Sequence, residues 1–193
     1  MRISQQGLDL IKLFEGCPTR GGVCYAYNDG TGTPTIGYGH TKGVKYSDTC
    51  TLEQAEEYLK QDVASAEKNV TSWDNIYHWN INEFSALVSF AFNNGSINQL
   101  VQWGKREKAQ ISDKILLYNK TIKGQVLEGL TRRRKAEKSL FDTPVENEQE
   151  HIYITVEDVC AGIWRGEFDT PWSKSDKLYK YFQNMINKGV GKC

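Results

Sequence analysis

The sequence predicts an α+β fold with a small antiparallel β-lobe, a larger helical lobe and, behind them, a small helical C-terminal module. Apolar residues at helical spacing dominate residues 1–143, and a β-branched, aromatic and glycine-rich stretch interrupts them at 23–41. An acidic stretch without apolar periodicity follows at 144–151. We therefore expect a main domain at 1–143, a linker at 144–151 and a separate module at 152–193.

The first predicted helix carries a glutamate at its C-terminal end. Ser4 can cap this helix, and Leu8 and Ile11 share its apolar face. Gly16, directly behind Glu15, is a natural helix terminator. A carboxyl group in this last turn faces the negative end of the helix macrodipole, which favours its protonated form.

The segment 23–41 is predicted to form a small antiparallel hairpin or a three-stranded sheet. Its turn signals are DG and GT, and its glycines let the backbone approach another backbone or a ligand closely. Asp29 stands at the head of the turn, and Thr35 follows six residues later. We expect the hairpin to bring this carboxylate and this hydroxyl close to Glu15.

The rest of the main domain is predicted to be helical. A capping box that begins at Thr51 opens a long helix, 51–70. Asn80 or Asn82 caps the next helix, 83–93, which is apolar nearly all round and should therefore be the central core helix. Further helices are expected at 98–105 and 111–118, together with a basic helix that Thr131 caps and that ends near Phe141.

The charge balance excludes several classes of partner. Lys and Arg number 24, as do Asp and Glu, so no net charge favours nucleic acid or a membrane surface. The first ten residues, MRISQQGLDL, lack the apolar core of a signal peptide, and no stretch reaches the length of a membrane span. We expect a soluble monomer without a membrane span.

The five cysteines suggest disulfides or buried thiols rather than a metal site. They have neither the short paired spacings nor the histidine partners of a zinc site, so we expect no metal and no cofactor. Cys17 with Cys24 and Cys160 with Cys193 are the favoured disulfides, and Cys24 with Cys50 is an alternative. The odd number leaves at least one thiol unpaired within the chain, and buried free thiols are an equally good interpretation.

Two carboxylates and a nearby hydroxyl suit glycoside hydrolysis. One carboxylic acid protonates the leaving oxygen, while the other carboxylate activates water or attacks the sugar. Glu15, at a helix C-terminus, suits the acid, and Asp29, on a polar turn, suits the base. A helix-ending glutamate and an aspartate in a DG turn are also common without any catalytic role.

The order of the motifs gives a more specific indication. FEG, YND, TIGYGHT, LKQDVA, FSALVSFAFNNG and GLTRRRKAEKSLF follow one another over residues 3–141, and in this order they closely resemble the phage-type lysozymes of glycoside hydrolase family 24. The resemblance implies that Glu15 is the general acid, Asp29 the second carboxylate and Thr35 the residue that holds the attacking water. It also implies cleavage of the β-1,4 bond between N-acetylmuramic acid and N-acetylglucosamine in peptidoglycan, with inversion.

The resemblance assigns supporting roles as well. His40 matches a structural histidine paired with an aspartate, here Asp62, although a general base is the alternative. Arg132 matches the arginine that lies beside the general acid, which leaves Arg133 and Arg134 for a solvated basic face.

Three further positions, Thr41, Phe92 and Asn93, match residues that line the sugar cleft. Core packing is an equally good interpretation of Phe92. The chain departs from the family between Glu15 and Asp29, where residues 17–24 lengthen the connection.

The function implied is that of a phage endolysin, made in the host cytoplasm and acting at the bacterial cell wall. A lytic transglycosylase and a non-catalytic peptidoglycan-binding protein are the alternatives, and a secreted antibacterial effector would share the chemistry. The tail, 152–193, faintly resembles a cell-wall-binding repeat, and a helical cap packed on the main domain is its rival.

Overall fold

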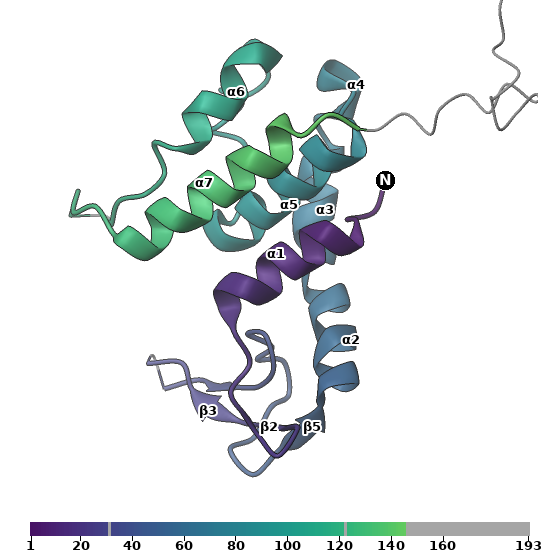
Figure 1. The fold of residues 1–193 in the computed structure, drawn as a ribbon, viewed down its shortest axis with the longest axis vertical. Coiled ribbons are helices and arrows are strands. Elements are labelled where there is room, and N and C mark those ends of the chain that lie inside the picture. The colour runs from purple at the N-terminus through teal and green to yellow at the C-terminus, as the bar shows by residue number, and fades with distance from the viewer. Residues whose placement is uncertain (31, 122, 146–193) are drawn as a thin grey trace, which may run out of the picture. The chain divides into compact units, whose positions relative to one another are not determined.

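The structure, a computed structural model, describes residues 1–30, 32–121 and 123–145 of the chain, and residues 1–145 form one compact unit (Figure 1). The predicted module at 152–193, most of the predicted linker and the Cys160–Cys193 pair lie outside the described residues. The elements are α1 (Gln5–Glu15), β1 (Thr19–Arg20), β2 (Val23–Tyr25), β3 (Tyr27–Asn28), β4 (Pro34–Thr35), β5 (Thr49–Thr51), α2 (Leu52–Asp62), α3 (Ala64–Thr71), α4 (Asp74–Tyr77), α5 (Ile81–Asn94), α6 (Lys108–Ile115) and α7 (Glu128–Asp142).

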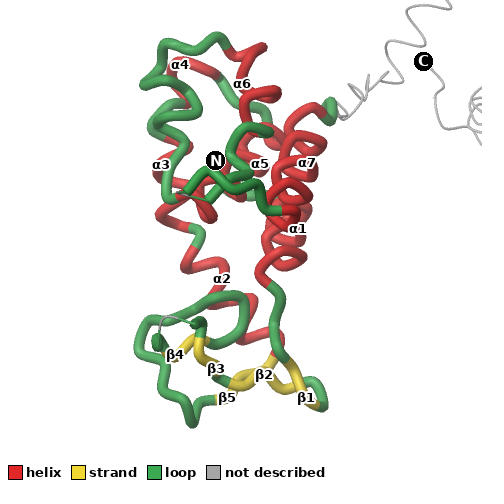
Figure 2. Tube along the Cα trace, turned by 90° about the vertical axis from the view of Figure 1, so that its left-hand side faces the viewer, coloured by secondary structure: helices red, strands yellow, loops and turns green. Residues whose placement is uncertain are grey.

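The β-lobe consists of two small antiparallel sheets. One has the strand order β1-β2-β5, and the other pairs β3 with β4. Figure 2 shows these strands gathered at one end of the unit, with α2 leading from them to the other helices. The apolar core of the β-lobe is small and consists of Cys24, Ile36, Cys50 and Ala55. The hairpin or three-stranded sheet predicted at 23–41 is instead divided between these two sheets, and β1 and β5 lie outside the predicted range.

Helix α1 forms as the sequence predicts. The Ser4 side chain accepts a hydrogen bond from the Gly7 backbone N–H at 3.2 Å, and Gly16 ends the helix with a φ of 67°. Leu8 and Ile11 are buried against the helical lobe. Glu15 is therefore the last helical residue, as expected.

The helix predicted at 51–70 is two helices, which is a correction. The capping box is present, since Thr51 Oγ1 accepts from the Gln54 N–H at 3.2 Å. At Val63, however, a ψ of −14° departs from the helical value of about −42° and separates α2 from α3. The apolar periodicity continues through both helices, so the pattern carried no signal for this change.

Helix α5 is the core helix, as predicted. Asn80 is its N-cap, its side chain accepting from the N–H groups of Asn82 and Glu83, each at 2.9 Å. Every residue from Glu83 to Ala91 is buried, and Gly95 ends the helix with a φ of 84°. The short helix α4 was not predicted.

The helices around α7 differ from the prediction. No helix forms at 98–105, because Gln102, Trp103 and Gly104 all have positive φ, which a right-handed helix excludes. Helix α6 begins and ends three residues earlier than expected. Helix α7 begins at Glu128, so Thr131 lies inside it and donates a hydrogen bond to the Leu127 carbonyl at 3.0 Å instead of capping it.

The favoured disulfide between Cys17 and Cys24 is not formed. Cys17, Cys24 and Cys50 are all free thiols, and Cys24 lies opposite Cys50 in the pairing of β2 with β5. Burial raises the pKa of Cys24 and of Cys50 to about 11. Within the described ranges, no three His, Cys, Asp or Glu residues are arranged to hold a metal ion, and no helix is long and apolar enough to cross a bilayer.

Candidate active site

Glu15 is one of the residues that line a pocket of the helical lobe. This pocket has a volume of about 790 Å³. The Glu15 side chain is 26% exposed, and its Oε1 accepts a hydrogen bond from Arg133 Nη1 at 2.6 Å. The pocket is lined by Leu13, Phe14, Glu15, Asn93, Leu127, Glu128, Gly129, Leu130, Arg132 and Arg133.

The arginine beside Glu15 is Arg133 and not Arg132, which corrects the sequence-based assignment. Helix α7 packs against α1 and α5 through the face that carries Arg133 and Arg134, so these two arginines are buried and form no solvated basic face. The Arg133 guanidinium also lies 5.7 Å from the centre of the Phe14 ring. Arg132 is exposed and contributes to the pocket wall.

Asp29 lies on the turn between β3 and β4, in the β-lobe. Its Oδ1 accepts from the Thr33 N–H at 3.3 Å, and its own N–H donates to the Thr33 carbonyl at 3.4 Å. Asn28 supports the same turn by accepting from the N–H groups of Gly30 and Gly32, at 2.9 and 3.0 Å. The turn is thus fixed by short-range hydrogen bonds, and Asp29 is exposed to solvent.

Thr35 follows on β4 and is almost fully buried, with 2% of its surface exposed. Its hydroxyl donates to the Thr33 carbonyl at 3.1 Å. The Thr35 oxygen retains lone pairs that can accept a hydrogen bond from a water molecule. Its position is therefore defined by the same turn that holds Asp29.

Tyr27 was not singled out from the sequence. Burial raises the pKa of the Tyr27 phenol, and the charges of Glu15, Cys17 and Asp29 raise it further. The phenol therefore lies within electrostatic reach of both carboxylates, which come from different lobes. The available sequence signal was the YND motif, in which Tyr27 stands two residues before Asp29.

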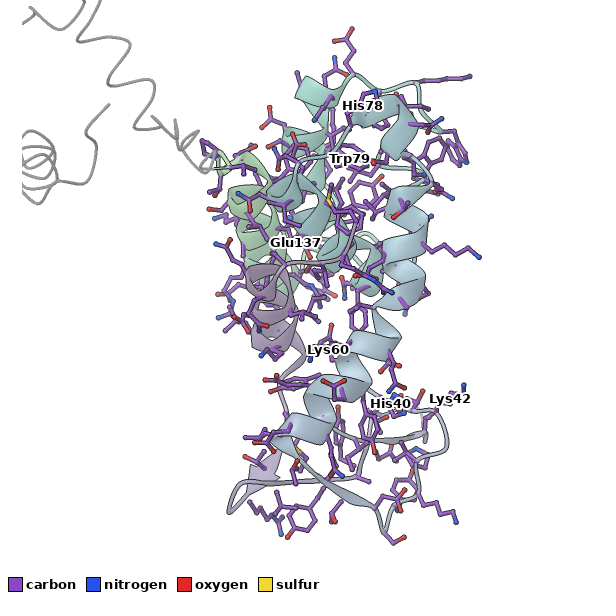
Figure 3. The ribbon with its side chains drawn as sticks, turned by 90° about the vertical axis from the view of Figure 1, so that its right-hand side faces the viewer. His40, Lys42, Lys60, His78, Trp79 and Glu137 are labelled. Atoms are coloured by element: carbon purple, nitrogen blue, oxygen red, sulfur yellow. The ribbon has the colours of Figure 1, made fainter. Side chains whose placement is uncertain are left out.

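The predicted pairing of His40 with Asp62 is confirmed. His40 Nδ1 lies 2.9 Å from Asp62 Oδ2, and Nε2 lies 3.1 Å from the Lys42 carbonyl oxygen. The imidazole also stacks on Tyr58, with ring centres 4.5 Å apart. Each ring nitrogen of His40 thus lies beside an oxygen acceptor, and Figure 3 labels the residue in the β-lobe.

The three positions expected in the sugar cleft have different environments. Asn93 lines the pocket beside Glu15, and its Oδ1 accepts from Arg134 Nη2 at 2.6 Å. Phe92 is half-buried and packs against the core. Thr41 is exposed. In the described part of the chain, only Asn93 of these three contributes to the pocket wall at Glu15.

Comparison with known proteins gives consistent matches. The family model described as phage lysozyme matches residues 12–137. An endolysin of Lactococcus phage c2 is 38% identical over 147 residues, which are 76% of this chain and 63% of that protein. The muramidase domain of SpmX from Asticaccaulis excentricus is 34% identical, with a TM-score of 0.61 over 74% of this chain and 99% of that one. The active form of P1 phage endolysin Lyz is 27% identical, with a TM-score of 0.64 over 77% of this chain and 89% of that one.

These matches bear on the fold and on the extent of the similarity. The likeness to the two solved structures confirms the predicted α+β class, with a small β-lobe and a larger helical lobe. The chain spans 63% of the length of the endolysins of Lactococcus phages c2 and phivML3.

Proposed function

Because the chain belongs to the phage lysozyme family, we propose that it is an endolysin that hydrolyses the β-1,4 bond between N-acetylmuramic acid and N-acetylglucosamine in bacterial peptidoglycan. The observation that supports this most is the placement of the two carboxylates. Glu15 ends α1 and lines the pocket, and Asp29 stands on the β3–β4 turn. The charges of both carboxylates contribute to the raised pKa of the Tyr27 phenol. Most glycoside hydrolases use two carboxyl groups that flank the bond to be cleaved.

In the proposed reaction Glu15 is the general acid. It transfers its proton to the glycosidic oxygen as the bond from that oxygen to the anomeric carbon breaks. It stands at the C-terminal end of α1, beside the last carbonyl groups of the helix, which carry partial negative charge. The pocket beside Glu15 would hold the sugar on the leaving-group side of the bond.

Asp29 is the proposed general base. It takes a proton from a water molecule as the water oxygen bonds to the anomeric carbon, and Thr35 holds that water by accepting one of its hydrogen bonds. The exposure of Asp29 and its hydrogen bond from the Thr33 N–H favour the ionised carboxylate. The water adds from the face opposite the leaving oxygen, so the configuration at the anomeric carbon inverts.

The chemistry of the products tests this proposal. Mass spectrometry of purified peptidoglycan after digestion should find new reducing N-acetylmuramic acid ends. Anhydro-muramic acid ends would instead identify a lytic transglycosylase, and an absence of cleavage would identify a non-catalytic peptidoglycan-binding protein. Proton NMR of the earliest product should detect the α-anomer, and a β-anomer would overturn the inverting role of Asp29.

We propose further that the chain acts as a monomer on the host cell wall and causes host lysis. In this proposal it is made in the host cytoplasm and reaches the wall at the end of infection. Analytical ultracentrifugation should give a sedimentation mass near the chain mass of 22.0 kDa. A mass of twice that value would exclude the monomer.

The tail, 152–193, is proposed to bind the cell wall. A shortened chain ending at Val145 tests this, because it keeps the hydrogen bonds from Asn82 Nδ2 to the carbonyl groups of Thr143 and Pro144. It should cleave soluble oligosaccharides at the full-length rate and sediment poorly with peptidoglycan. A large fall in melting temperature with unchanged wall affinity would show instead that the tail is a structural cap.

A further inference from the structure

Four charged side chains form a connected row that runs from the pocket wall into the interior of the helical lobe. Glu15 Oε1 lies 2.6 Å from Arg133 Nη1, and Arg133 Nε lies 3.2 Å from Glu137 Oε1. Glu137 Oε2 in turn lies 3.1 Å from Arg134 Nε. The side chains of Glu137 and Arg134 are completely buried, and that of Arg133 is 4% exposed. Figure 3 labels Glu137 among the helices of this lobe.

Glu137 is held firmly at the centre of the row. Its Oε1 accepts from the Ser89 hydroxyl on α5 at 2.9 Å, as well as from Arg133. Arg134 is held on its other side by Asn93 and by the Phe90 ring, whose centre is 4.8 Å from the guanidinium carbon. These contacts give Glu137 one defined position.

The charged groups around the row can be assigned helix by helix. Helix α7 supplies Arg133, Arg134 and Glu137, and α1 supplies Glu15, whereas α5 faces Glu137 with the neutral Ser89. The charge that α6 presents to α7, Asp113, pairs with Lys138 at 3.0 Å rather than with Glu137. From the β-lobe, Tyr27 lies within electrostatic reach of Glu15, whose charge adds to the larger effect of burial in raising the pKa of the Tyr27 phenol.

The row resolves a conflict in the proposed mechanism. A guanidinium 2.6 Å from a carboxylate favours the ionised carboxylate, yet a general acid must hold a proton. If Arg133 served Glu15 alone, it would oppose catalysis. Arg133 is instead shared between two carboxylates, and the deeper of the two has no access to solvent.

We propose that Glu137 is a positioning residue for the cleavage reaction, acting through Arg133, whose guanidinium it holds beside Glu15 and whose positive charge it offsets. This inference rests on the proposed role of Glu15 as the acid. Burial outweighs the opposing effects of Arg134, Arg133 and the Ser89 hydroxyl, so the pKa of the Glu137 carboxyl is raised. Two guanidinium groups that cannot lose their protons pair with this carboxyl, and these ion pairs favour its ionised form.

A purely structural role for Glu137 makes a different prediction. Buried ion pairs cost much to break whether or not they serve a site, so a fall in melting temperature alone does not distinguish the two roles. If Glu137 acts electrostatically, its mutation shifts the pH–rate profile of the reaction. If its role is only structural, the profile keeps its position. The test must therefore measure rate against pH.

The principal variant is Glu137→Gln, which keeps the shape and the acceptor oxygen but removes the charge. With the Arg133 charge no longer offset, Glu15 loses its proton more readily, and the alkaline limb of kcat/KM should move to lower pH by about one unit. At a pH above that limb, activity should fall about tenfold through kcat, with KM nearly unchanged.

Glu67→Gln is the matched control. Glu67 is also a buried carboxylate, 5% exposed, and its ion pair with Arg2, at 2.7 Å, lies outside the row. This variant should lose stability but keep the wild-type pH profile. The conservative Glu137→Asp should move the alkaline limb in the same direction as Glu137→Gln but by less. The negative charge remains, but the shorter side chain places it farther from Arg133.

An alkaline limb in Glu137→Gln at the wild-type pH would overturn the proposal. If Glu137→Gln fails to fold, Glu137→Asp is measured instead. An alkaline limb of kcat/KM at the wild-type pH in Glu137→Asp would overturn the proposal equally. Carbon-13 NMR of the Glu15 carboxyl in the resting protein separates this inference from the proposed function. Its titration midpoint should be lower in Glu137→Gln even if Glu15→Gln shows that Glu15 is not the acid.

Discussion

The two lobes hold their carboxylates by different physical means. In the helical lobe Glu15 is anchored by Arg133, which comes from a helix 118 residues away in the chain and lies within a buried charged row. In the β-lobe Asp29 is anchored by Thr33, four residues away, on an exposed turn between two-residue strands. The helical lobe also has an extensive core, whereas four residues make up the buried core of the β-lobe.

This difference teaches how the two lobes can prepare two carboxyl groups for different tasks. In the proposed mechanism the acid, Glu15, stands beside a guanidinium that it shares with a buried carboxylate. The proposed base, Asp29, is exposed on a turn and accepts a hydrogen bond from the Thr33 N–H. The two lobes should therefore respond differently to mutation, with changes near Glu15 affecting both stability and activity, and changes at Asp29 affecting activity alone.

Asp29→Asn should have the largest effect and should separate activity from stability. The amide oxygen can still accept from the Thr33 N–H, so the turn and the melting temperature should be retained. An amide cannot take a proton from water, and turnover should fall by roughly a hundred- to ten-thousandfold. Rates on purified peptidoglycan and a thermal melt measure both quantities, and a large loss of stability would contradict the turn-based account.

Arg133→Met should destabilise the helical lobe strongly. Glu15 and Glu137 would each lose a partner, and breaking a buried ion pair in this way costs about 3–5 kcal/mol. Arg132→Met, at the exposed neighbouring position, is the control and should change the free energy of unfolding by less than about 0.5 kcal/mol. Chemical denaturation measures both variants, and equal effects would contradict the assignment of Arg133 as the buried arginine.

Gly37→Ala tests the packing of the small β-lobe core. A Cβ there would lie 2.9 Å from the Ala55 Cβ, and φ is 62°. Gly43, with a φ of 76° and open space around it, is the matched control. Gly43→Ala should cost about 1–2 kcal/mol for the left-handed backbone alone, and Gly37→Ala about 1–3 kcal/mol more for overpacking. Urea denaturation that gave equal costs would show that this core is loosely packed.

Asp142→Asn should have the smallest effect and should depend on pH. Burial raises the pKa of Asp142, but hydrogen bonds from Lys138 and Ser112 outweigh it, so the net pKa is lowered. The group therefore stabilises the fold above its ordinary pKa, and this contribution is lost as pH falls through the lowered value. The wild type should exceed the variant by roughly 0.2–1 kcal/mol at neutral pH, and the difference should vanish in acid. A difference that grew in acid would contradict this sign.

The sequence predicted local features well and long-range ones poorly. The Ser4 cap, the Thr51 capping box and the Gly16 terminator depend on neighbouring residues, and the structure has all three. In GLTRRRKAEKSLF, however, three successive arginines look alike. Which of them is buried depends on where α7 begins and on which face it presents to α5, and neither is encoded nearby.

The same limit applies to the charged row. Glu137 lies in a basic, polar segment, and only the packing of α7 against α5 places it beside Ser89 with no exposed surface. The pairing of His40 with Asp62 was accessible because the family resemblance supplied it. The resemblance assigned no role to Glu137 or to Tyr27, although both lie in the matching motifs, so the roles of these two residues emerged only from the structure.

The central claim is that Glu15 provides the proton for cleavage, and one comparison tests it most directly. Glu128 lines the same pocket but is exposed and stands at the start of α7, so Glu128→Gln is the matched control for Glu15→Gln. Turnover of purified peptidoglycan should fall by roughly a hundred- to ten-thousandfold in Glu15→Gln and stay within a few-fold of wild type in Glu128→Gln. Near-normal turnover in Glu15→Gln, or an equal loss in Glu128→Gln, would contradict the account.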